Sequence, residues 1–284
     1  MKKTLGALIV AAAVLGGCAE DPAGPAQLLG RRIYGVDTGN NLVLFGSGSP
    51  GTISRRSAIQ GLQAGEQVIG IDFRPTVAAG VPASEIGMLY GVTSASRVIK
   101  IDTATAVATV VGSLTSGGSA FALAGGAFGV DFNPTVDRTR VHSDARQNLR
   151  LNQTVSPVAV TIDTVLGYVA GDANANNASA IVASAYTPAV IGGTTSLLAI
   201  DALRDVIGLS ERPNGGTLRT VAPLPVDAGN DAGFDIANDG MAFATLTTMG
   251  SSRTTLYMVS GLPGAAQFTS LGQVRAVLRG IAVP

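Results

Sequence analysis

The feature that most constrains this chain is an internal repeat with a period of roughly 50 residues. A short apolar segment containing a Gly-apolar-Asp pattern recurs as VIGIDFRP ending at Pro75, AFGVDFNP ending at Pro134 and AGFDIAND around Asp235. Degenerate copies are IVASAYTP ending at Pro188 and LRGIAVP at the C-terminus. The corresponding positions are spaced by 59, 54, 50 and 47 residues, and they are Gly70, Gly129, Ala183, Gly233 and Gly280. A repeat of this length is typical of solenoids and propellers.

Further strand-like runs follow the repeated segment. The second runs are RIYGVD, MLYGVT, RTRVHSD, SLLAID and MAFATL, and the third are NLVLF, RVIKID, NLRLN, VIGLS and TLYMV. A fourth, Thr- or Val-rich run reads TISRRSAI, AVATVVG, AVTID, TLRTVAPL and AAQFTSL. β-Branched residues between turn residues favour short strands. Four strands per unit predict an all-β fold, a β-propeller of five four-stranded blades.

The two ends of the repeat array complement each other. RIYGVDTG from Arg32 has no repeated segment before it, and LRGIAVP has no run after it. We therefore expect residues 279–284 to supply the inner strand of the blade begun by residues 32–57. Such pairing would close the ring and remove two exposed sheet edges.

Two stretches allow more than one interpretation. DALRDVIGLSER, from Asp201 to Arg212, could form an amphipathic helix, but its alignment with TSASRVIKIDTA favours a turn followed by a strand. The glycine-rich stretches 46–51 and 112–126 have no Lys-Ser/Thr ending and precede no predicted helix. We interpret both as loops and not as phosphate cradles.

The first 18 residues have the order of a secretory signal. Lys2 and Lys3 precede an apolar run from Leu5 to Val14, which is too short to span a bilayer as a helix. Leu-Gly-Gly-Cys18 resembles the bacterial lipobox, and Cys18 is the only cysteine of the chain. The resemblance implies lipidation of Cys18 and cleavage before it; the alternative is an ordinary signal peptide with a chance cysteine.

These features predict three segments: a lipoprotein signal peptide over residues 1–18, a flexible tether over 19–30 and a propeller domain over 31–284. Acyl chains on Cys18 would hold the mature protein on a membrane. Ala19, and not Asp, follows the cysteine, so by resemblance to enterobacterial sorting we expect the outer membrane of the cell envelope.

Composition narrows the classes of partner. The chain is 46% hydrophobic and 13% charged, which is typical of a globular domain. It carries 19 basic and 19 acidic residues, and loss of Lys2 and Lys3 with the leader leaves a net charge of about −2. No basic stripe is present to bind phosphates, so we expect no nucleic-acid partner. We expect a monomer without a cofactor, whose partners are the membrane and an envelope protein or glycan.

One string carries a family resemblance. AFGVDFNPTVDRTRVHSDARQNLRLN, from Ala127 to Asn152, resembles the hallmark of the bacterial family Domain of Unknown Function 4394. IYGVDTGNNLVLF, LQAGEQVIGIDFRP, RVIKIDTATAVATVVG and the closing GIAVP are also similar, so the resemblance extends from about Arg31 to Pro284. It implies a propeller-like, often secreted protein with no assigned activity. His142 departs from the pattern, because an apolar residue is expected there.

Asp72, Asp131 and Asp235 occupy the same position in three predicted inner strands. In a ring they would lie at one height near the central channel, where three carboxylates could bind a cation. The interpretation we favour is structural: each carboxylate accepts hydrogen bonds from backbone or arginine groups of the next blade.

The other candidates favour structural roles. A strand-turn-strand corner gathers the polar groups of Asp131, Asn133, Asp137, Arg138 and Arg140. This pattern indicates an arginine–carboxylate fork that fixes the turn, with a catalytic pair as the alternative. Asp172, Asn174 and Asn176 alternate like calcium-loop ligands, but the required Gly and Glu are replaced by Asn177 and Ala183, so we expect an exposed loop. His142 is the single histidine, which excludes a multi-histidine metal site.

The function that the sequence favours is a membrane-anchored, non-catalytic propeller that binds a protein, glycan or small solute. One alternative is a hydrolase or lactonase-like propeller enzyme with a metal held by Asp72, Asp131 and Asp235. A structural envelope protein without a soluble ligand is a third hypothesis.

Overall fold

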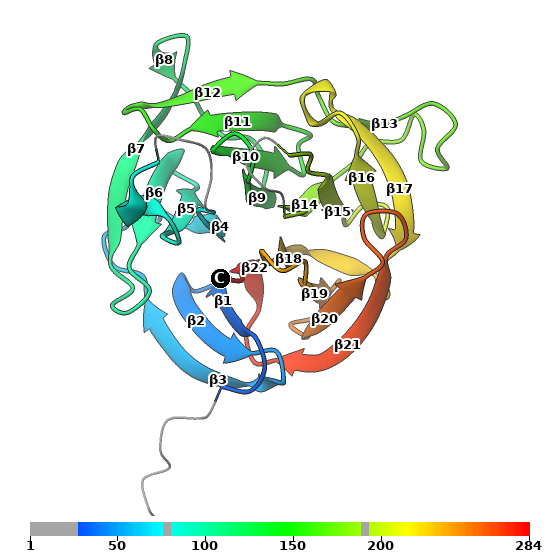
Figure 1. The fold of residues 1–284 in the computed structure, drawn as a ribbon, viewed down its shortest axis with the longest axis horizontal. Coiled ribbons are helices and arrows are strands. Elements are labelled where there is room, and N and C mark those ends of the chain that lie inside the picture. Colours follow the sequence, from blue (N-terminus) through cyan, green and yellow to red (C-terminus); the bar gives the residue numbers. More distant parts are fainter. Residues whose placement is uncertain (1–27, 76–80, 189–192) are drawn as a thin grey trace, which may run out of the picture.

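The computed structural model describes residues 28–75, 81–188 and 193–284. The protein is an all-β propeller, in which strands surround a central axis (Figure 1). Cys18 and the predicted signal peptide lie outside the described residues. The last residues of the predicted tether are described, and the Leu29 carbonyl accepts a hydrogen bond from the Gly48 N–H at 2.9 Å. Within the described residues, no helix has the length and apolar character needed to cross a membrane.

The strands form groups, which we number along the chain. The first group has the order β22-β1-β2-β3, with β22 (Leu278–Ala282), β1 (Arg32–Asp37), β2 (Asn41–Gly46) and β3 (Ser49–Ala58). The second has β4 (Val68–Phe73), β5 (Leu89–Thr93), β6 (Arg97–Ile101) and β7 (Ala108–Ser116). The third has β9 (Phe128–Asn133), β10 (Arg138–Ser143), β11 (Asn148–Asn152) and β12 (Val158–Ile162).

The fourth group has β14 (Ile181–Tyr186), β15 (Leu197–Asp201), β16 (Val206–Ser210) and β17 (Thr217–Pro223). The fifth has β18 (Ala228–Ile236), β19 (Ala242–Thr248), β20 (Thr254–Ser260) and β21 (Gln267–Val274). Short additions are β8 (Ser119–Ala120), β13 (Gly167–Tyr168) and two 3₁₀ turns, η1 (Ala83–Glu85) and η2 (Pro213–Gly215). Each of the sequence-predicted runs forms a strand in its expected place.

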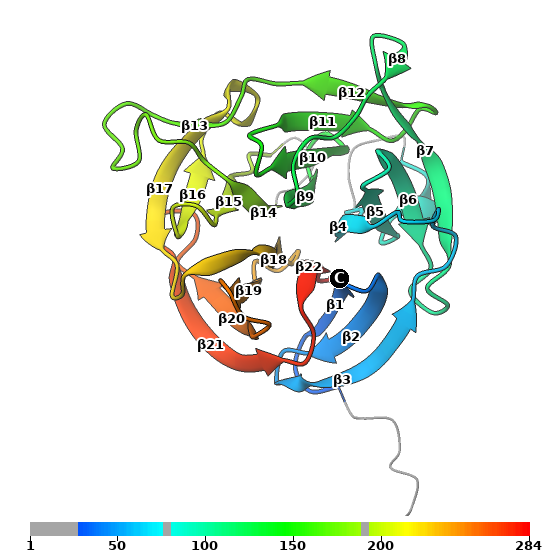
Figure 2. The ribbon, with the colours of Figure 1, turned by 180° about the vertical axis from the view of Figure 1, so that it is seen from behind.

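Burial explains why the inner and outer strands differ in sequence. β4, β9, β14, β18 and β22 lie nearest the axis and β3, β7, β12, β17 and β21 at the rim (Figures 1 and 2). β14 is buried at every residue, whereas most residues of β7 and β21 are exposed or only partly buried. A strand buried on both faces needs small and apolar residues, while a rim strand accepts Thr, Ser and Gln.

Two sequence interpretations are settled by the strand pairing. Asp201 pairs with Val206 at a tight turn between β15 and β16, so the helix alternative for residues 201–212 is wrong. The interpretation of the glycine-rich stretches as loops is also wrong in part. Residues 112–116 belong to β7, whose Thr115 and Ser116 pair with β8 around a turn at Gly117 and Gly118, and residues 49–51 begin β3.

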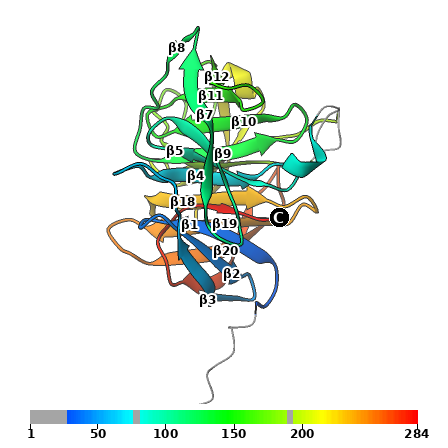
Figure 3. The same cartoon turned by 90° about the vertical axis from the view of Figure 1, so that its left-hand side faces the viewer.

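The first and last strands come together in the first group. β22 pairs antiparallel with β1, with Tyr34 opposite Ala282 and Gly35 opposite Ile281. Leu278 and Ile281 are buried against Ile33. At the rim, parallel pairing of β7 with β12 joins the second and third groups into one nine-stranded sheet. Figure 3 shows the groups from the side.

Candidate functional site

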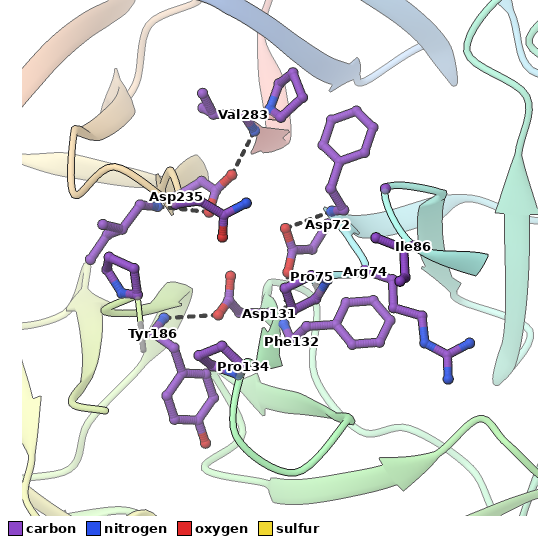
Figure 4. Close-up of a pocket in the computed structure, with 16 residues that line it drawn as sticks. Asp72, Arg74, Pro75, Ile86, Asp131, Phe132, Pro134, Tyr186, Asp235 and Val283 are labelled. Atoms are coloured by element: carbon purple, nitrogen blue, oxygen red, sulfur yellow. Dashed lines mark hydrogen bonds between the residues drawn. The ribbon is translucent and has the colours of Figure 1, made fainter. Parts of the chain in front are cut away.

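The inner strands bring Asp72, Asp131 and Asp235 together at the central axis. The three residues come from β4, β9 and β18, and each is buried, with no more than 7% of its surface exposed. Carboxylate oxygens of all three lie within 4.8 Å of one another. Figure 4 shows the side chains pointing toward a common centre.

Geometry explains why a glycine stands two residues before each aspartate. Alternate residues of a strand point to the same side, so the glycine and the aspartate both face the next inner strand. A Cβ at Gly70 would lie 2.4 Å from the Val130 side chain, and one at Gly129 would lie 2.5 Å from Ser184. The repeated Gly-apolar-Asp pattern therefore combines a close approach of backbones with a side chain that reaches across.

Each aspartate accepts a hydrogen bond from the inner strand of the next group. Asp72 Oδ2 accepts the Phe132 N–H at 2.7 Å, and Asp131 Oδ2 accepts the Tyr186 N–H at 2.8 Å. Asp235 Oδ2 accepts the Val283 N–H of the C-terminal segment at 2.6 Å. The carboxylates thus link the second group to the third, the third to the fourth and the fifth to the first.

Two of the aspartates also bond to their own strand. Asp72 Oδ1 accepts the Phe73 N–H at 2.6 Å, and Asp235 Oδ1 accepts the Ile236 N–H at 2.7 Å. The groups before these strands carry Ala282 and Ala185 where the others carry aspartate. Five backbone N–H groups in or next to the inner strands therefore occupy five of the six carboxylate oxygens, and among the residues that the structure describes no backbone N–H reaches the sixth, Asp131 Oδ1.

Burial and mutual repulsion shift the protonation of this cluster. Burial raises the pKa of Asp235 to about 7. The pKa of Asp72 lies well above its usual value because of burial and then the charge of Asp235. Asp131 shows the same direction, with burial as the main cause of the raised pKa and the charges of Asp72 and Asp235 adding to it. The cluster therefore favours a bound proton or a bound cation near neutral pH.

A small cavity of about 130 Å³ opens at the cluster. Its wall includes Arg74, whose guanidinium forks onto the Asp137 carboxylate and also reaches the Tyr90 hydroxyl at 3.2 Å. Arg74 lies 3.6 Å from Glu85 as well. Since these partners hold Arg74, it does not neutralise the aspartates.

The fork predicted at Asp137 exists, but its partner was assigned wrongly. Arg74 of the preceding group binds this carboxylate, whereas Arg138 donates to the Asp137 carbonyl at 2.8 Å. Arg140 pairs with Asp163 at 2.7 Å instead. The sequence interpretation failed because the true partner lies 63 residues away.

The Asp172 loop uses its carboxylate to hold a turn. Asp172 accepts the Asn174 N–H at 2.8 Å and the Thr220 N–H of β17 at 2.7 Å. Asn176 is exposed. The carboxylate therefore docks this loop on the rim strand, as a structural residue would.

His142 is fully buried on β10, and neither ring nitrogen has a hydrogen-bond partner. Burial, and then the charge of Arg140, lowers the pKa of His142 to about 3. A neutral, enclosed imidazole cannot reach a substrate as a general base. An apolar residue was expected at this position, and His142 packs there as an apolar residue would.

The fold and the aspartate-linked inner strands define a β-propeller. The chain belongs to the family described as Domain of unknown function (DUF4394), whose model matches residues 41–282. A comparison with curated proteins finds no match.

Several solved structures are similar at low identity. Virginiamycin B lyase from Staphylococcus aureus matches with 10% identity and a TM-score of 0.39, over 84% of this chain and 69% of that one. The β-propeller domain of Cps50 (Swd1) from Myceliophteria thermophila has 12% identity and a TM-score of 0.41, over 88% and 73%. YCF48 bound to D1 peptide has 10% identity and a TM-score of 0.37, over 84% and 77%.

Proposed function

We propose that this chain is an exported, lipid-anchored β-propeller that acts as a binding or scaffold module of the bacterial envelope, and not as an enzyme. The observation that carries the proposal is the use of the central carboxylates. Five of their six oxygens accept backbone N–H groups. These carboxylates therefore serve to connect the inner strands of neighbouring groups, and we call each such contact between inner strands a joint. The single histidine is buried away from solvent.

The proposed ring has five four-stranded blades, closed by the C-terminal strand. Support comes from the strand order of the first group, β22-β1-β2-β3, and from the contacts between consecutive inner strands. Those contacts run from β4 through β9, β14, β18 and β22 back to β4. A rigid ring with variable loops on its faces suits recognition of a protein or glycan.

The anchoring part of the proposal is tested at Cys18. We expect the full-length protein to incorporate labelled palmitate and to fractionate with outer membranes. Cys18→Ser should abolish labelling and release or stall the precursor, while the neighbouring control Ala19→Ser should behave as the unchanged protein. A Cys18→Ser protein that reaches mature size and stays with membranes would overturn the lipid anchor.

A metal-dependent hydrolase or lactonase is the second candidate, favoured by the three carboxylates within 4.8 Å of one another. Thermal unfolding with calcium and after chelation separates the two. A calcium-dependent rise of several degrees that Asp131→Asn abolishes, and that the exposed control Asp227→Asn keeps, would favour the metal site. Equal melting under both conditions would favour the structural joint.

A further inference from the structure

A polar cleft lies between the third and fourth strand groups, beside the central cavity. It consists of two overlapping hollows of about 330 and 410 Å³. Both are lined by Asn133, Arg140, Tyr186 and Asn214. Volumes of this size suit a small-molecule ligand.

Strand register gathers arginines in this cleft. Arg138 and Arg140 are two residues apart on β10 and so lie on the same face. Arg150 of β11 stands directly opposite Arg140. Arg212 lines the cleft from the fourth group, just before η2.

The cleft has a surplus of positive charge. Asp163 is the carboxylate that binds here, at 2.7 Å from Arg140 and 2.8 Å from Arg150. Among the described residues, Arg138 donates only to the carbonyls of Val136 and Asp137, and neither Arg138 nor Arg212 forms an ion pair there. Four guanidinium groups thus face one carboxylate, on a protein whose mature net charge is about −2. Such a concave positive site attracts an oxyanion.

The base of the cleft is held in place. The Arg140 side chain is 2% exposed, and its guanidinium donates to Tyr186 Oη at 3.2 Å, Asn148 Oδ1 at 2.6 Å and Asn214 Oδ1 at 2.7 Å. Because these contacts join β10, β14 and the η2 turn, the donors at the cleft floor are positioned before a ligand arrives.

The rest of the wall is polar too, with hydroxyl and amide groups from Asn133, Thr135, Thr194, Thr195 and Asn214. Most ligand pockets are lined mainly by apolar side chains. Here Val136 and Pro213 are the apolar exceptions, so the complementary ligand carries hydroxyl groups as well as negative charge.

We propose that this cleft binds an anionic sugar, a polyhydroxylated ring with a carboxylate or a phosphate group. Arg138 and Arg212 bind the oxyanion, and the threonine and asparagine side chains bind the hydroxyls. The inference rests on the proposed binding function and names its ligand class. Its failure would leave the lipid anchor and the aspartate joints untouched, since fractionation and unfolding test those.

Isothermal titration calorimetry on the mature-length protein tests the site with four probes: glucuronic acid, glucose 6-phosphate, glucose and inorganic phosphate. We expect at least one acidic sugar to bind about 10-fold or more tightly than both glucose and inorganic phosphate. The tighter of the two acidic sugars identifies the oxyanion as a carboxylate or a phosphate.

The matched variants keep the buried Arg140 intact. Arg138→Gln/Arg212→Gln should weaken acidic-sugar binding about 10-fold or more, because it removes two charge-assisted donors from partly or fully exposed positions. The control Arg253→Gln removes an exposed guanidinium from the fifth group and should change the affinity by less than about twofold. No binding of either acidic sugar at millimolar concentration, equal binding of inorganic phosphate, or equal loss in the control would each overturn the proposal.

Discussion

The inner strands of neighbouring groups meet in two ways. At three joints an aspartate reaches across: Asp72 to the third group, Asp131 to the fourth and Asp235 to the first. At the other two joints Ala282 and Ala185 stand in the corresponding position, and an alanine methyl group accepts no hydrogen bond from the next inner strand. There the N–H of the next strand is satisfied by that strand's own aspartate.

The use of aspartate at three joints and alanine at two balances the number of N–H donors against the number of charges at the axis. Five N–H groups point to the axis, and an unsatisfied buried donor costs about 1–3 kcal/mol. Here each carboxylate oxygen accepts at most one of these N–H groups, and with that pattern three aspartates, which offer six oxygens, are needed for five donors. Five aspartates would place five like charges in one buried space, where each added charge raises the pKa of its neighbours.

Apolar packing holds the alanine joints instead. Between the fourth and fifth groups, Val182 and Ile207 share one buried cluster with Phe234. Between the first and second groups, the rings of Tyr34 and Phe73 meet edge to face with their centroids 5.5 Å apart. Asn40 Oδ1 also accepts the Val68 N–H at 3.1 Å across this joint.

Removing one aspartate joint together with its strand should have the largest effect. Deletion of residues 279–284 removes the Val283 N–H that Asp235 accepts and the pairing of β22 with β1. We expect loss of cooperative thermal unfolding, measured by circular dichroism, because two sheet edges become exposed. Unchanged melting of a soluble monomer would contradict the closure of the ring.

Replacing single aspartates by alanine should lower the free energy of unfolding in proportion to the number of N–H groups that lose their acceptor. Asp235→Ala orphans the Ile236 and Val283 N–H groups, whereas Asp131→Ala orphans only that of Tyr186. At pH 5 we expect free-energy losses of about 2–6 kcal/mol and about 1–3 kcal/mol, respectively.

Urea unfolding at pH 5 measures both losses while repulsion between carboxylates is weak. The exposed variant Asp227→Ala is the control and should change little. Equal losses in Asp235→Ala and Asp131→Ala would show that donor count does not determine the strength of a joint.

Adding an aspartate to an alanine joint should lower the free energy of unfolding, and more so at high pH. Ala185→Asp places a fourth carboxyl beside an Ile236 N–H that Asp235 already binds. We expect a loss of about 3 kcal/mol at pH 8 relative to Ala185→Asn, which matches it in size, and a smaller difference at pH 5. If the two variants unfold alike at pH 8, charge does not limit the number of aspartates.

Removing the charge of Asp131 should change the free energy of unfolding least, and at high pH it should increase it. Raised folded pKa values mean that the aspartate cluster stabilises the fold fully below pH 4 and that this contribution is lost as pH rises through about 7. Asp131→Asn keeps an acceptor for Tyr186, so it should unfold like the unchanged protein at pH 5 and be about 1–3 kcal/mol more stable at pH 8.

His142 acts in the opposite direction in this range, because its pKa lowered to about 3 makes stability fall as pH drops below 6.5. The Asp131→Asn variant and the unchanged protein both contain His142, so its effect cancels in the difference between their free energies of unfolding. A Asp131→Asn variant that is less stable than the unchanged protein at pH 8 would show that the carboxylate charge is favourable.

Most of the fold follows from the sequence, because the repeat makes each strand visible several times. The alignment of DALRDVIGLSER with a clearer unit identified a strand that local periodicity alone left open. The same alignment placed Asp72, Asp131 and Asp235 at one level. β8 and β13 were missed, since two-residue pairings depend on where neighbouring strands lie and leave no pattern in the chain.

Partners distant in the chain could not be predicted in the same way. The fork at Asp137 was expected from adjacent arginines, but the fold brings Arg74 of the preceding strand group to it. The arginine cleft was missed too, although the alternation of Arg138 and Arg140 on one strand was a usable signal. Its other wall, with Arg212 and Asn214, belongs to the next group and becomes visible only in the folded structure.

A pH titration of the backbone amide signals by NMR tests the account most directly. We expect the Ile236 and Val283 amides to shift together with a midpoint near pH 7, because both donate to Asp235, and those of Phe73, Phe132 and Tyr186 to shift well above pH 4. Amides that stay still, or that move with the ordinary aspartate midpoint near pH 4, would contradict a buried carboxylate belt joining the strand groups.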